Sequence, residues 1–357
     1  MRLSKPTQFF ILASLTLITG FLVHRSNSTS PFLPKFHFTS ISRPNLSDFM
    51  QQSELLFQRA VAKRREIRHL FGDRGFFPAK DENSFKETPW SIWDLVTPSY
   101  GCPWEMERIG RVGEGGWWVC GLSRLASSKG KKQSCLVYSF VQYNPLSGRG
   151  IPLGCEIASD IETILELGVG NDSSFEAELL ARTDCEIWGY DPHVPGFNFG
   201  PEVTDEMRGR THFERVGVSG GTDEAGKLYT IQELMKRNGH SYIDLLKTDV
   251  EYSEYNTLSS LNGHTLPGAP GAFSSPDPLK PEFPIGQIVV EMHIFEWQGI
   301  TASVFLDWWE SMEYRGLRAV WREVDTVAVG MGVEDGLERL CVYTLLNVQD
   351  SKNKLYH

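Results

Sequence analysis

The stretch from Ile164 to Gly170, ILELGVG, constrains the fold of this chain more than any other. An apolar run typical of a buried parallel strand ends in two glycines that flank one apolar residue. Asn171 to Ala181 follows with its apolar residues at helical spacing, and Asp172, Ser173 or Ser174 can serve as the N-cap. Strand, Gly-x-Gly turn and helix predict a nucleotide-type site, because glycine allows a close backbone approach and the helix N-terminus offers free N–H groups.

The residues around the two glycines separate two kinds of nucleotide site. The third glycine of the dinucleotide pattern GxGxxG is absent, since Ser173 occupies its place. The next predicted strand, Glu186 to Tyr190, ends at Asp191, about 20 residues after the glycines, where a ribose-binding carboxylate is expected. Glu166 adds a second carboxylate just before the turn. A nicotinamide-dependent oxidoreductase would fit the glycines and Asp191, but the missing third glycine argues against it.

At these residues the chain resembles a class I S-adenosylmethionine-dependent methyltransferase. In that class ExGxG is the first motif, and an acid after the second strand holds the ribose hydroxyls. The resemblance implies that Glu166, Gly168, Gly170 and Asp191 bind S-adenosyl-L-methionine, and that the fold is a Rossmann-like seven-stranded α/β sheet.

Strands and helices alternate from Ile161 on, as a doubly wound sheet requires. The patterns predict further strands at Thr211–Val218, Tyr242–Lys247, Ile288–Glu291, Leu317–Val324 and Leu340–Leu346. They predict helices at Thr230–Lys236, Ser253–Leu261 and Thr301–Tyr314. The last two strands have no helical crossover between them and resemble the antiparallel pair that closes class I methyltransferase sheets. A Gly, Pro and Ser-rich insertion at 262–284 is too long for a simple connection and predicts a flexible loop.

Residues 89–154 are dense in Trp, Cys and Gly and predict an N-terminal module that packs on the core. This module contains GGWWVC and CLVYSF, and YIDLLKTDVEYSEY follows further along the chain. With these segments the chain resembles the methyltransferase-like protein 24 family and, more distantly, the FkbM-type sugar O-methyltransferases. The likeness spans roughly Cys102 to Asn347. We expect the methyltransferase domain itself at 155–350, after the N-terminal module.

Candidate site residues follow from the sheet, because ligands of an open α/β sheet bind outside the carboxyl ends of its strands. The residues predicted at those ends are Glu166, Gly168, Gly170, Asp191, Asp249, Glu251, Glu291 and His293. Carboxylates that face one another repel unless a ligand, a metal or a proton compensates, so their convergence on one rim predicts a functional site.

The chemistry expected at this rim is proton removal from an acceptor, because methyl transfer from a sulfonium needs alignment and a base. His293 is one candidate base, since imidazole titrates near neutrality, and Asp249 is the competing one. Strand alternation turns Glu291 to the same side as His293. Alternatively, Asp249, Glu251 and His293, with Glu291, hold a divalent cation that lowers the pKa of the acceptor. Tyr252 replaces the glycine of the related families' pattern IDxLKxDxEGxE, which keeps a catalytically inactive relative open as an alternative.

The N-terminus predicts the compartment. Arg2 and Lys5 precede an apolar stretch from Phe9 to Val23, which makes a helix of about 22 Å at about 1.5 Å per residue. That helix is short for a bilayer core of about 30 Å and lies at the upper limit of a signal-peptide core. Residues 1–25 are therefore predicted to be a signal-anchor or a cleaved signal peptide. The expected product is a single-pass type II membrane protein of the Golgi or ER with a lumenal domain, or a secreted protein.

Other features agree with a lumenal address. Asn27 and Asn45 lie in glycosylation sequons, and the six cysteines include no CxxC pair, which argues against zinc and allows disulfides. Residues 26–88 are predicted to be a stem with a helix at 48–71 that can self-associate. The net charge of −10 argues against nucleic acid as a partner. Together with this lumenal address, the resemblance to the FkbM-type sugar O-methyltransferases implies a glycan or a small-molecule hydroxyl as the acceptor.

Overall fold

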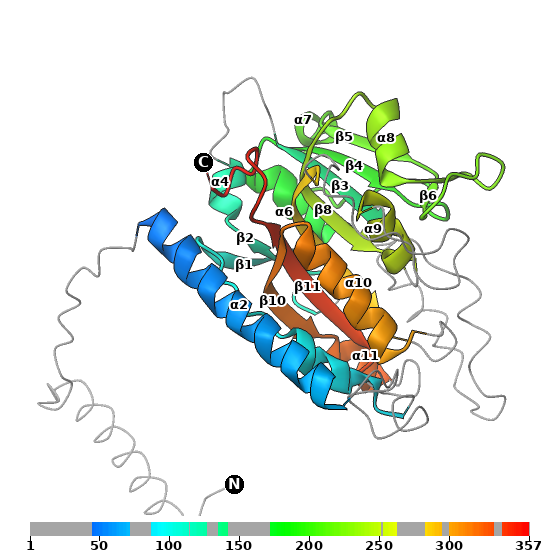
Figure 1. Ribbon diagram of the computed structural model, residues 1–357. Helices are drawn as coiled ribbons and strands as arrows, with labels where there is room; N and C mark the ends of the chain where they lie inside the picture. Colours follow the sequence, from blue (N-terminus) through cyan, green and yellow to red (C-terminus); the bar gives the residue numbers. More distant parts are fainter. Residues whose placement is uncertain are drawn as a thin grey trace, which may run out of the picture. The chain divides into compact units, whose positions relative to one another are not determined.

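The computed structural model describes residues 45–71, 87–113, 115–126, 135–141, 172–250, 253–262, 283–294, 300–331 and 338–356. The chain divides into residues 1–44 and a second unit from Asn45 to His357, which holds every element named below. Figure 1 shows the central sheet of this second unit with helices on both of its faces.

The sheet has seven strands. In spatial order they are β5 (Thr211–Glu214), β4 (Glu186–Tyr190), β3 (Leu136–Val141), β8 (Ile243–Asp249), β9 (Ile285–His293), β11 (Leu340–Asn347) and β10 (Leu317–Val324). The strands from β5 to β9 pair in parallel, and β11 is antiparallel to both β9 and β10. This arrangement confirms the predicted mostly parallel α/β sheet with an antiparallel closing pair, and it fits a Rossmann-like methyltransferase.

The central strand β3 is a correction to the sequence prediction. Its residues alternate between the two faces, since Tyr138 and Phe140 pack in one apolar core and Val137 in the other. Val137 is opposite Ile187 of β4 on one side and Leu245 of β8 on the other. The prediction that Ile164–Gly170 fills this position is wrong, and those residues lie outside the described ones. The predicted boundary between 154 and 155 therefore does not separate a module from the sheet, because β3 precedes it.

One face of the sheet is covered by helices that follow its strands. They are α8 (Ile231–Arg237), α9 (Glu254–Asn262) and α10 (Ala302–Tyr314), together with the 3₁₀ helix η1 (Pro89–Val96). The hydroxyls of Thr230 and Thr301 accept hydrogen bonds from the backbone N–H three residues on, so both are N-caps. The apolar residues of these helices pack with Tyr138 and Phe140 in the larger core.

The other face carries α6 (Ser174–Arg182), α4 (Leu122–Ala126) and the antiparallel hairpin of β1 (Met106–Ile109) and β2 (Trp117–Cys120). The short elements that complete the described residues are α7 (Asp205–Arg208), β6 (Gly217–Val218), β7 (Leu228–Tyr229) and α11 (Thr326–Met331). The predicted strand Thr211–Val218 is thus divided between β5 and β6.

Two disulfides link neighbouring segments of the fold, one within the β1–β2 region and one between two strands of the sheet. Cys102 pairs with Cys120 at the end of β2, and Cys135 pairs with Cys185, so that the starts of β3 and β4 are joined. Cys341, inside β11, is a buried free thiol, whose pKa burial raises above its usual value. The sequence allowed disulfides without fixing their connectivity, which the structure supplies for these four cysteines.

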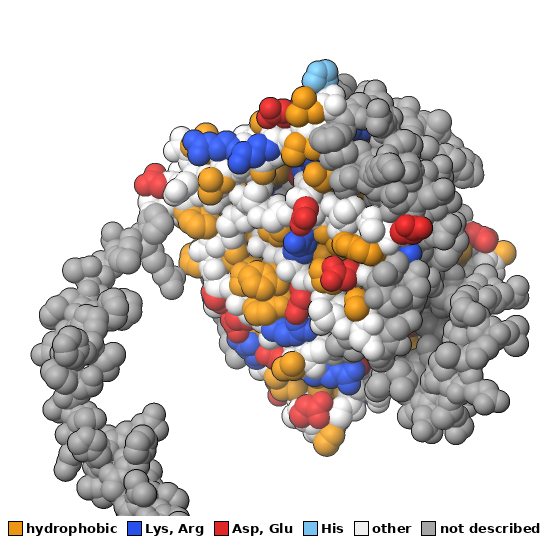
Figure 2. All heavy atoms as spheres, turned by 90° about the horizontal axis from the view of Figure 1, so that it is seen from below, with side chains coloured by type: hydrophobic (Ala, Val, Ile, Leu, Met, Phe, Trp, Pro, Cys, Tyr) orange, Lys and Arg blue, Asp and Glu red, His pale blue; other side chains and the backbone are white. Residues whose placement is uncertain are grey.

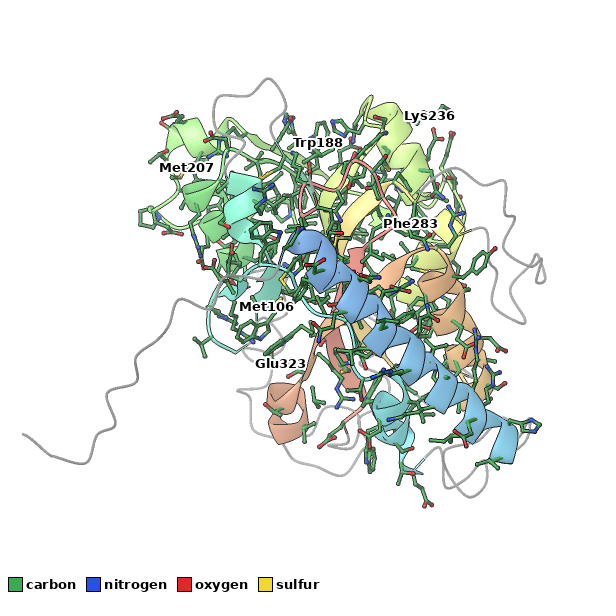
Figure 3. All side chains as sticks on the ribbon, turned by 60° about the vertical axis from the view of Figure 1, so that its left-hand side comes forward. Met106, Trp188, Met207, Lys236, Phe283 and Glu323 are labelled. Atoms are coloured by element: carbon green, nitrogen blue, oxygen red, sulfur yellow. A yellow bond between two sulfur atoms is a disulfide. The ribbon has the colours of Figure 1, made fainter. Side chains whose placement is uncertain are left out.

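The predicted stem helix is α2 (Leu46–Phe71), and it packs against the folded unit instead of forming an independent stem. Phe57 and Val61 are buried against residues that include Tyr100 and Leu346. Figures 1 and 3 show α2 lying along one side of the folded unit. Met106 and Glu323 of that unit are labelled in Figure 3. The buried guanidinium of Arg64 pairs with Glu310 and Glu313 of α10.

Additional ion pairs anchor the two ends of α2. Arg68 pairs with Asp307 at 2.6 Å, and Glu54 pairs with Arg318 at 3.1 Å. Because these pairs span most of α2, we infer that the helix belongs to the domain. Among the described residues, no helix is both long and apolar enough to cross a membrane.

The expectation that nucleic acid is not a partner stays a prediction, and the charges of one face can be compared with it. On the face shown in Figure 2, Lys and Arg side chains alternate with Asp and Glu side chains over the described residues. A nucleic-acid site needs basic side chains gathered on one face, because affinity depends on the number of phosphates neutralised. This face therefore offers the mixed charge of an ordinary solvated surface.

Candidate functional site

A hollow opens where the carboxyl ends of β3 and β4 meet the N-terminus of α6. Its lining residues are Ser139, Asp172, Ser173, Glu176, Gly189, Tyr190, Asp191, Val194, Gly196, Phe197, Phe213 and Lys247. They come from four neighbouring parallel strands, β5, β4, β3 and β8, from the loop after β4, and from the start of α6 with the two residues before it. This is the edge at which doubly wound sheets bind their ligands.

Asp191 follows β4 directly and is only 2% exposed. Its Oδ1 accepts hydrogen bonds from the backbone N–H groups of His193 at 2.6 Å and Val194 at 3.2 Å, which close the turn after the strand. Its buried Oδ2 has no hydrogen-bond partner among the described residues. Burial raises the pKa of Asp191, against the opposing effect of the two backbone hydrogen bonds. A buried carboxylate oxygen without a partner is costly, and a ligand hydroxyl would satisfy it.

A buried ion pair forms the floor of the hollow. Lys247 of β8, fully inaccessible to solvent, donates to Glu176 Oε1 at 3.0 Å, and the Ser139 hydroxyl donates to the same oxygen at 2.7 Å. The Lys247 ammonium also lies 5.6 Å from the ring centre of Trp117 and 5.3 Å from that of Phe175. These contacts fix β3, β8 and α6 together at the end of the sheet where the hollow lies.

The β1–β2 loop covers the beginning of α6. The backbone N–H of Gly110 donates to Glu178, that of Arg111 donates to Ser174 Oγ, and the Arg111 guanidinium pairs with Asp172 at 2.6 Å. Gly110 has a φ of +90°, and a Cβ there would meet the Phe175 backbone at 3.1 Å, so this position requires glycine. The Gly-rich run before GGWWVC therefore packs on the nucleotide-type helix.

A second group of polar side chains lies at the carboxyl ends of β8 and β9. Asp249, Glu291 and His293 each bring one ligand atom within 4.8 Å of the other two. Asp249 is 7% exposed and His293 3%, and the His293 Nε2 lies 3.9 Å from Glu291. The Asp249 and Glu291 carboxyl groups are close enough for Glu291 to affect the pKa of Asp249. Burial raises the pKa of Asp249, and the charges of His293 and Lys247 oppose that rise.

The orientation of His293 is set by residues of α9. Glu254 Oε1 accepts a hydrogen bond from the His293 backbone N–H at 2.9 Å and lies 3.3 Å from its Nδ1. The Tyr255 hydroxyl donates to the His293 carbonyl at 2.8 Å. Glu254 is fully buried, so the carboxylate holds the imidazole with Nδ1 toward α9 and Nε2 toward Glu291.

The family comparison adds an independent observation to this geometry. Residues 62–145 match the model of a methyltransferase domain family. The matched span contains β1, β2 and β3, and it ends four residues after the central strand. The match and the order of the sheet support a class I methyltransferase-like family. No curated protein matches the chain.

On this methyltransferase-like sheet, the structure brings together most of the predicted site residues that it describes. Asp191 lines the hollow over β3 and β4, whereas Asp249, Glu291 and His293 meet over β8 and β9. Asp249 and His293 are the last residues of their strands, which extend two residues beyond the predicted ends. The remaining predicted residues, Glu166, Gly168, Gly170 and Glu251, lie outside the described residues.

Sequence reasoning missed the residues that support this methyltransferase-like site. Lys247 carries a detectable signal, because a lysine in the apolar strand YIDLLK must have a buried partner. Glu176 lies in the first turn of α6, where the helix dipole favours an acid in any case. Its sequence position therefore could not show that it pairs with Lys247. Glu254 and Ser139 reach the site only through tertiary packing, and nothing in their local sequence indicates it.

Proposed function

We propose that the chain is an S-adenosyl-L-methionine-dependent methyltransferase of the secretory pathway that methylates a hydroxyl of a glycan or glycoconjugate. The observation that carries the cofactor assignment is Asp191, which lines the hollow at the end of β4 and whose buried Oδ2 has no described partner. Ribose hydroxyls are the donors that such an oxygen accepts in class I methyltransferases. The predicted Gly168 and Gly170 would bring the backbone close to the same ligand.

The residues of the rim divide into a cofactor half and an acceptor half. S-adenosyl-L-methionine would supply an electrophilic methyl group, and Asp191 with the first turn of α6 would bind and orient it. Asp249, Glu291 and His293 would face the acceptor hydroxyl from β8 and β9 and hold the proton that it loses as its oxygen bonds to the methyl carbon. His293 can take this proton at Nε2, since its Nδ1 faces Glu254. Asp249 is the alternative base.

The glycan acceptor and the lumenal address rest on separate support. The resemblance to FkbM-type enzymes favours a sugar hydroxyl, and disulfides form mainly in oxidising compartments, so Cys102–Cys120 and Cys135–Cys185 favour the secretory pathway. Asn45 is exposed directly before α2, where a glycan would not meet the folded unit. Residues 1–25 would hold the protein as a type II Golgi or ER membrane protein, or release it for secretion.

Binding of radiolabelled S-adenosyl-L-methionine by the purified full chain tests the cofactor assignment. We expect saturable binding at one site per chain and competition by S-adenosylhomocysteine but not by NAD. Absence of binding would exclude the proposed enzyme. Binding without methyl transfer to any glycan hydroxyl offered would favour the inactive relative that Tyr252 leaves open.

Glycosidase digestion of the chain expressed in animal cells tests the address. A lumenal chain should carry glycans at Asn27 and Asn45, and the double variant Asn27→Gln, Asn45→Gln should migrate like the digested protein. A chain that is found in the cytosol and is unaffected by glycosidase would contradict the secretory proposal without affecting the cofactor assignment.

A further inference from the structure

We propose that Asp249, Glu291 and His293 form a binding site for one divalent cation of the Mn²⁺ type at the acceptor half of the rim. The sequence left the metal open and named Asp249, Glu251, Glu291 and His293 as its candidate ligands. Of these four, the structure describes Asp249, Glu291 and His293, and Glu291 and His293 extend from the same side of β9 toward Asp249.

The first argument is the ligand geometry. The three candidate ligand atoms lie within 4.8 Å of one another, so a cation of bond length about 2.1–2.4 Å can contact all of them after small side-chain rotations. All three side chains project from the ends of two adjacent, paired strands, which is a rigid support. Register places Thr248 opposite Val290, so Asp249 and Glu291 come from neighbouring positions.

The second argument is the orientation of the histidine. Metal-binding histidines usually donate the second ring N–H to a carboxylate, which fixes the tautomer and raises the basicity of the ligand nitrogen. Glu254 lies 3.3 Å from Nδ1 and has no access to solvent, while Nε2 is the nitrogen that faces Glu291. Glu254 Oε2 has no hydrogen-bond partner among the described residues, so this carboxylate is not consumed by another contact.

The third argument is charge. Asp249, Glu254 and Glu291 place three carboxylates around one imidazole, and Lys247, whose charge acts on Asp249, is already paired with Glu176. Even a protonated His293 would leave the group with a charge of −2 if all three acids were ionised. Buried like charges are costly unless protons or a cation compensate them. A divalent ion would compensate that charge.

The identity of the cation follows from the donor set. Carboxylate oxygens suit Mg²⁺, Ca²⁺ and Mn²⁺, whereas imidazole suits later transition metals. Mn²⁺ accepts both kinds of ligand and keeps positions open for water or a hydroxyl. With Nε2 bound to the ion, His293 would no longer act as the base. If the proposed function holds, the ion would instead lower the pKa of a sugar hydroxyl bound to it, and the proton would pass to water.

The test is titration of the full chain with Mn²⁺ alone, followed by electron paramagnetic resonance of the free ion. We expect one bound ion per chain and an electron spin-echo modulation from a directly bound ¹⁴N. His293→Gln should abolish the ¹⁴N modulation and weaken binding at least about 10-fold, and Asp249→Asn should weaken it similarly. Glu254→Gln should weaken binding about 10- to 100-fold, as expected for the carboxylate behind a histidine ligand.

The matched control is Glu186→Gln, at the first residue of β4 and so away from the proposed ligands. Glu186 lies 2.7 Å from His212, so the substitution removes a carboxylate from a carboxylate–histidine pair that belongs to no three-ligand group among the described residues. This variant should bind Mn²⁺ like the parent. Circular dichroism checks folding, and Glu291→Gln, whose side chain is the least buried of the three ligands, provides a second variant if Asp249→Asn fails to fold.

Two results would overturn the site. One is a parent chain that leaves the free Mn²⁺ signal unchanged, and the other is equal binding by the parent, His293→Gln and Asp249→Asn. Both measurements omit S-adenosyl-L-methionine, so they fail or succeed independently of cofactor binding at Asp191. Equal binding by the parent and both variants would mean that the ion binds elsewhere on the chain.

Discussion

Replacing Asp191 by asparagine should weaken cofactor binding without destabilising the fold. The amide oxygen of Asn can still accept from the His193 and Val194 backbone N–H groups, which close the turn through Oδ1. The amide nitrogen then occupies the place of Oδ2, which has no described partner, and it cannot accept from a ribose hydroxyl. The substitution thus removes the ligand contact and keeps the turn.

The magnitude follows from the charge of the lost acceptor. A hydrogen bond to a charged group contributes about 1.5–3 kcal/mol. Since about 1.4 kcal/mol is a factor of ten, the dissociation constant for S-adenosyl-L-methionine should rise about 10- to 150-fold. Isothermal titration calorimetry of the parent and the variant measures this ratio. Glu186→Gln, a carboxylate-to-amide change on the same strand, should leave it unchanged.

Asp191→Asn should weaken cofactor binding, but it should not lower the stability of the ligand-free protein. Burial raises the pKa of Asp191 in the folded state, so its carboxyl binds a proton more tightly there than in the unfolded chain. Its contribution to stability is therefore present below the unfolded pKa and is lost as the pH rises through the folded pKa. At neutral pH, Asp191→Asn should unfold at the same denaturant concentration as the parent or at a higher one.

The pH dependence gives a third readout of the same group. If the ionised carboxylate accepts the ribose hydroxyls, affinity should fall as the pH decreases through the raised pKa of Asp191, and this dependence should be absent in Asp191→Asn. Unchanged affinity in the variant would refute the cofactor assignment. Reduced affinity with an equal loss of stability would show that Asp191 only maintains the fold.

Two further predictions concern the support of the site. Lys247→Met should lower the free energy of unfolding by about 3–5 kcal/mol, because it leaves Glu176 buried without its charge partner, and adding Glu176→Gln should restore part of the loss in urea unfolding. A loss below about 1 kcal/mol would contradict this. Removing Cys135–Cys185 should cost about 4 kcal/mol and removing Cys102–Cys120 about 3 kcal/mol, since the sequence separations are 50 and 18. The reverse order in thermal or urea unfolding would show that strain or denatured-state structure outweighs loop closure.

The sequence predicted the fold class because its signals are local. Apolar runs of strand length, separated by amphipathic helices, are enough to indicate a doubly wound sheet, and the capping threonine Thr230 is in place. Which run fills the centre is not a local property. Both CLVYSF and ILELGVG are apolar, and the pairing of Val137 with Ile187 and Leu245 decides between them. The position of ILELGVG directly before the glycines therefore led to the wrong choice of central strand.

The same distinction explains what was found and missed at the site. Asp191, Asp249 and His293 lie at strand ends, so a rule about sheets located them. Glu254 belongs to α9 and reaches His293 only because that helix packs across the end of β9. The docking of α2 escaped prediction for a similar reason, since Arg64 has the spacing of a solvated helix face and finds its partners on α10, far along the chain.

The two halves of the rim are electrostatically connected through β8. Lys247 and Asp249 are two residues apart in this strand, so their side chains extend to the same face. Lys247 pairs with Glu176 at the floor of the cofactor hollow, and its charge also favours the ionised form of Asp249, whose pKa burial raises. Removing the ammonium must therefore disturb the acceptor half as well as the fold. The lysine in YIDLLK thus sets the charge balance at which Asp249 can act as a base or a ligand.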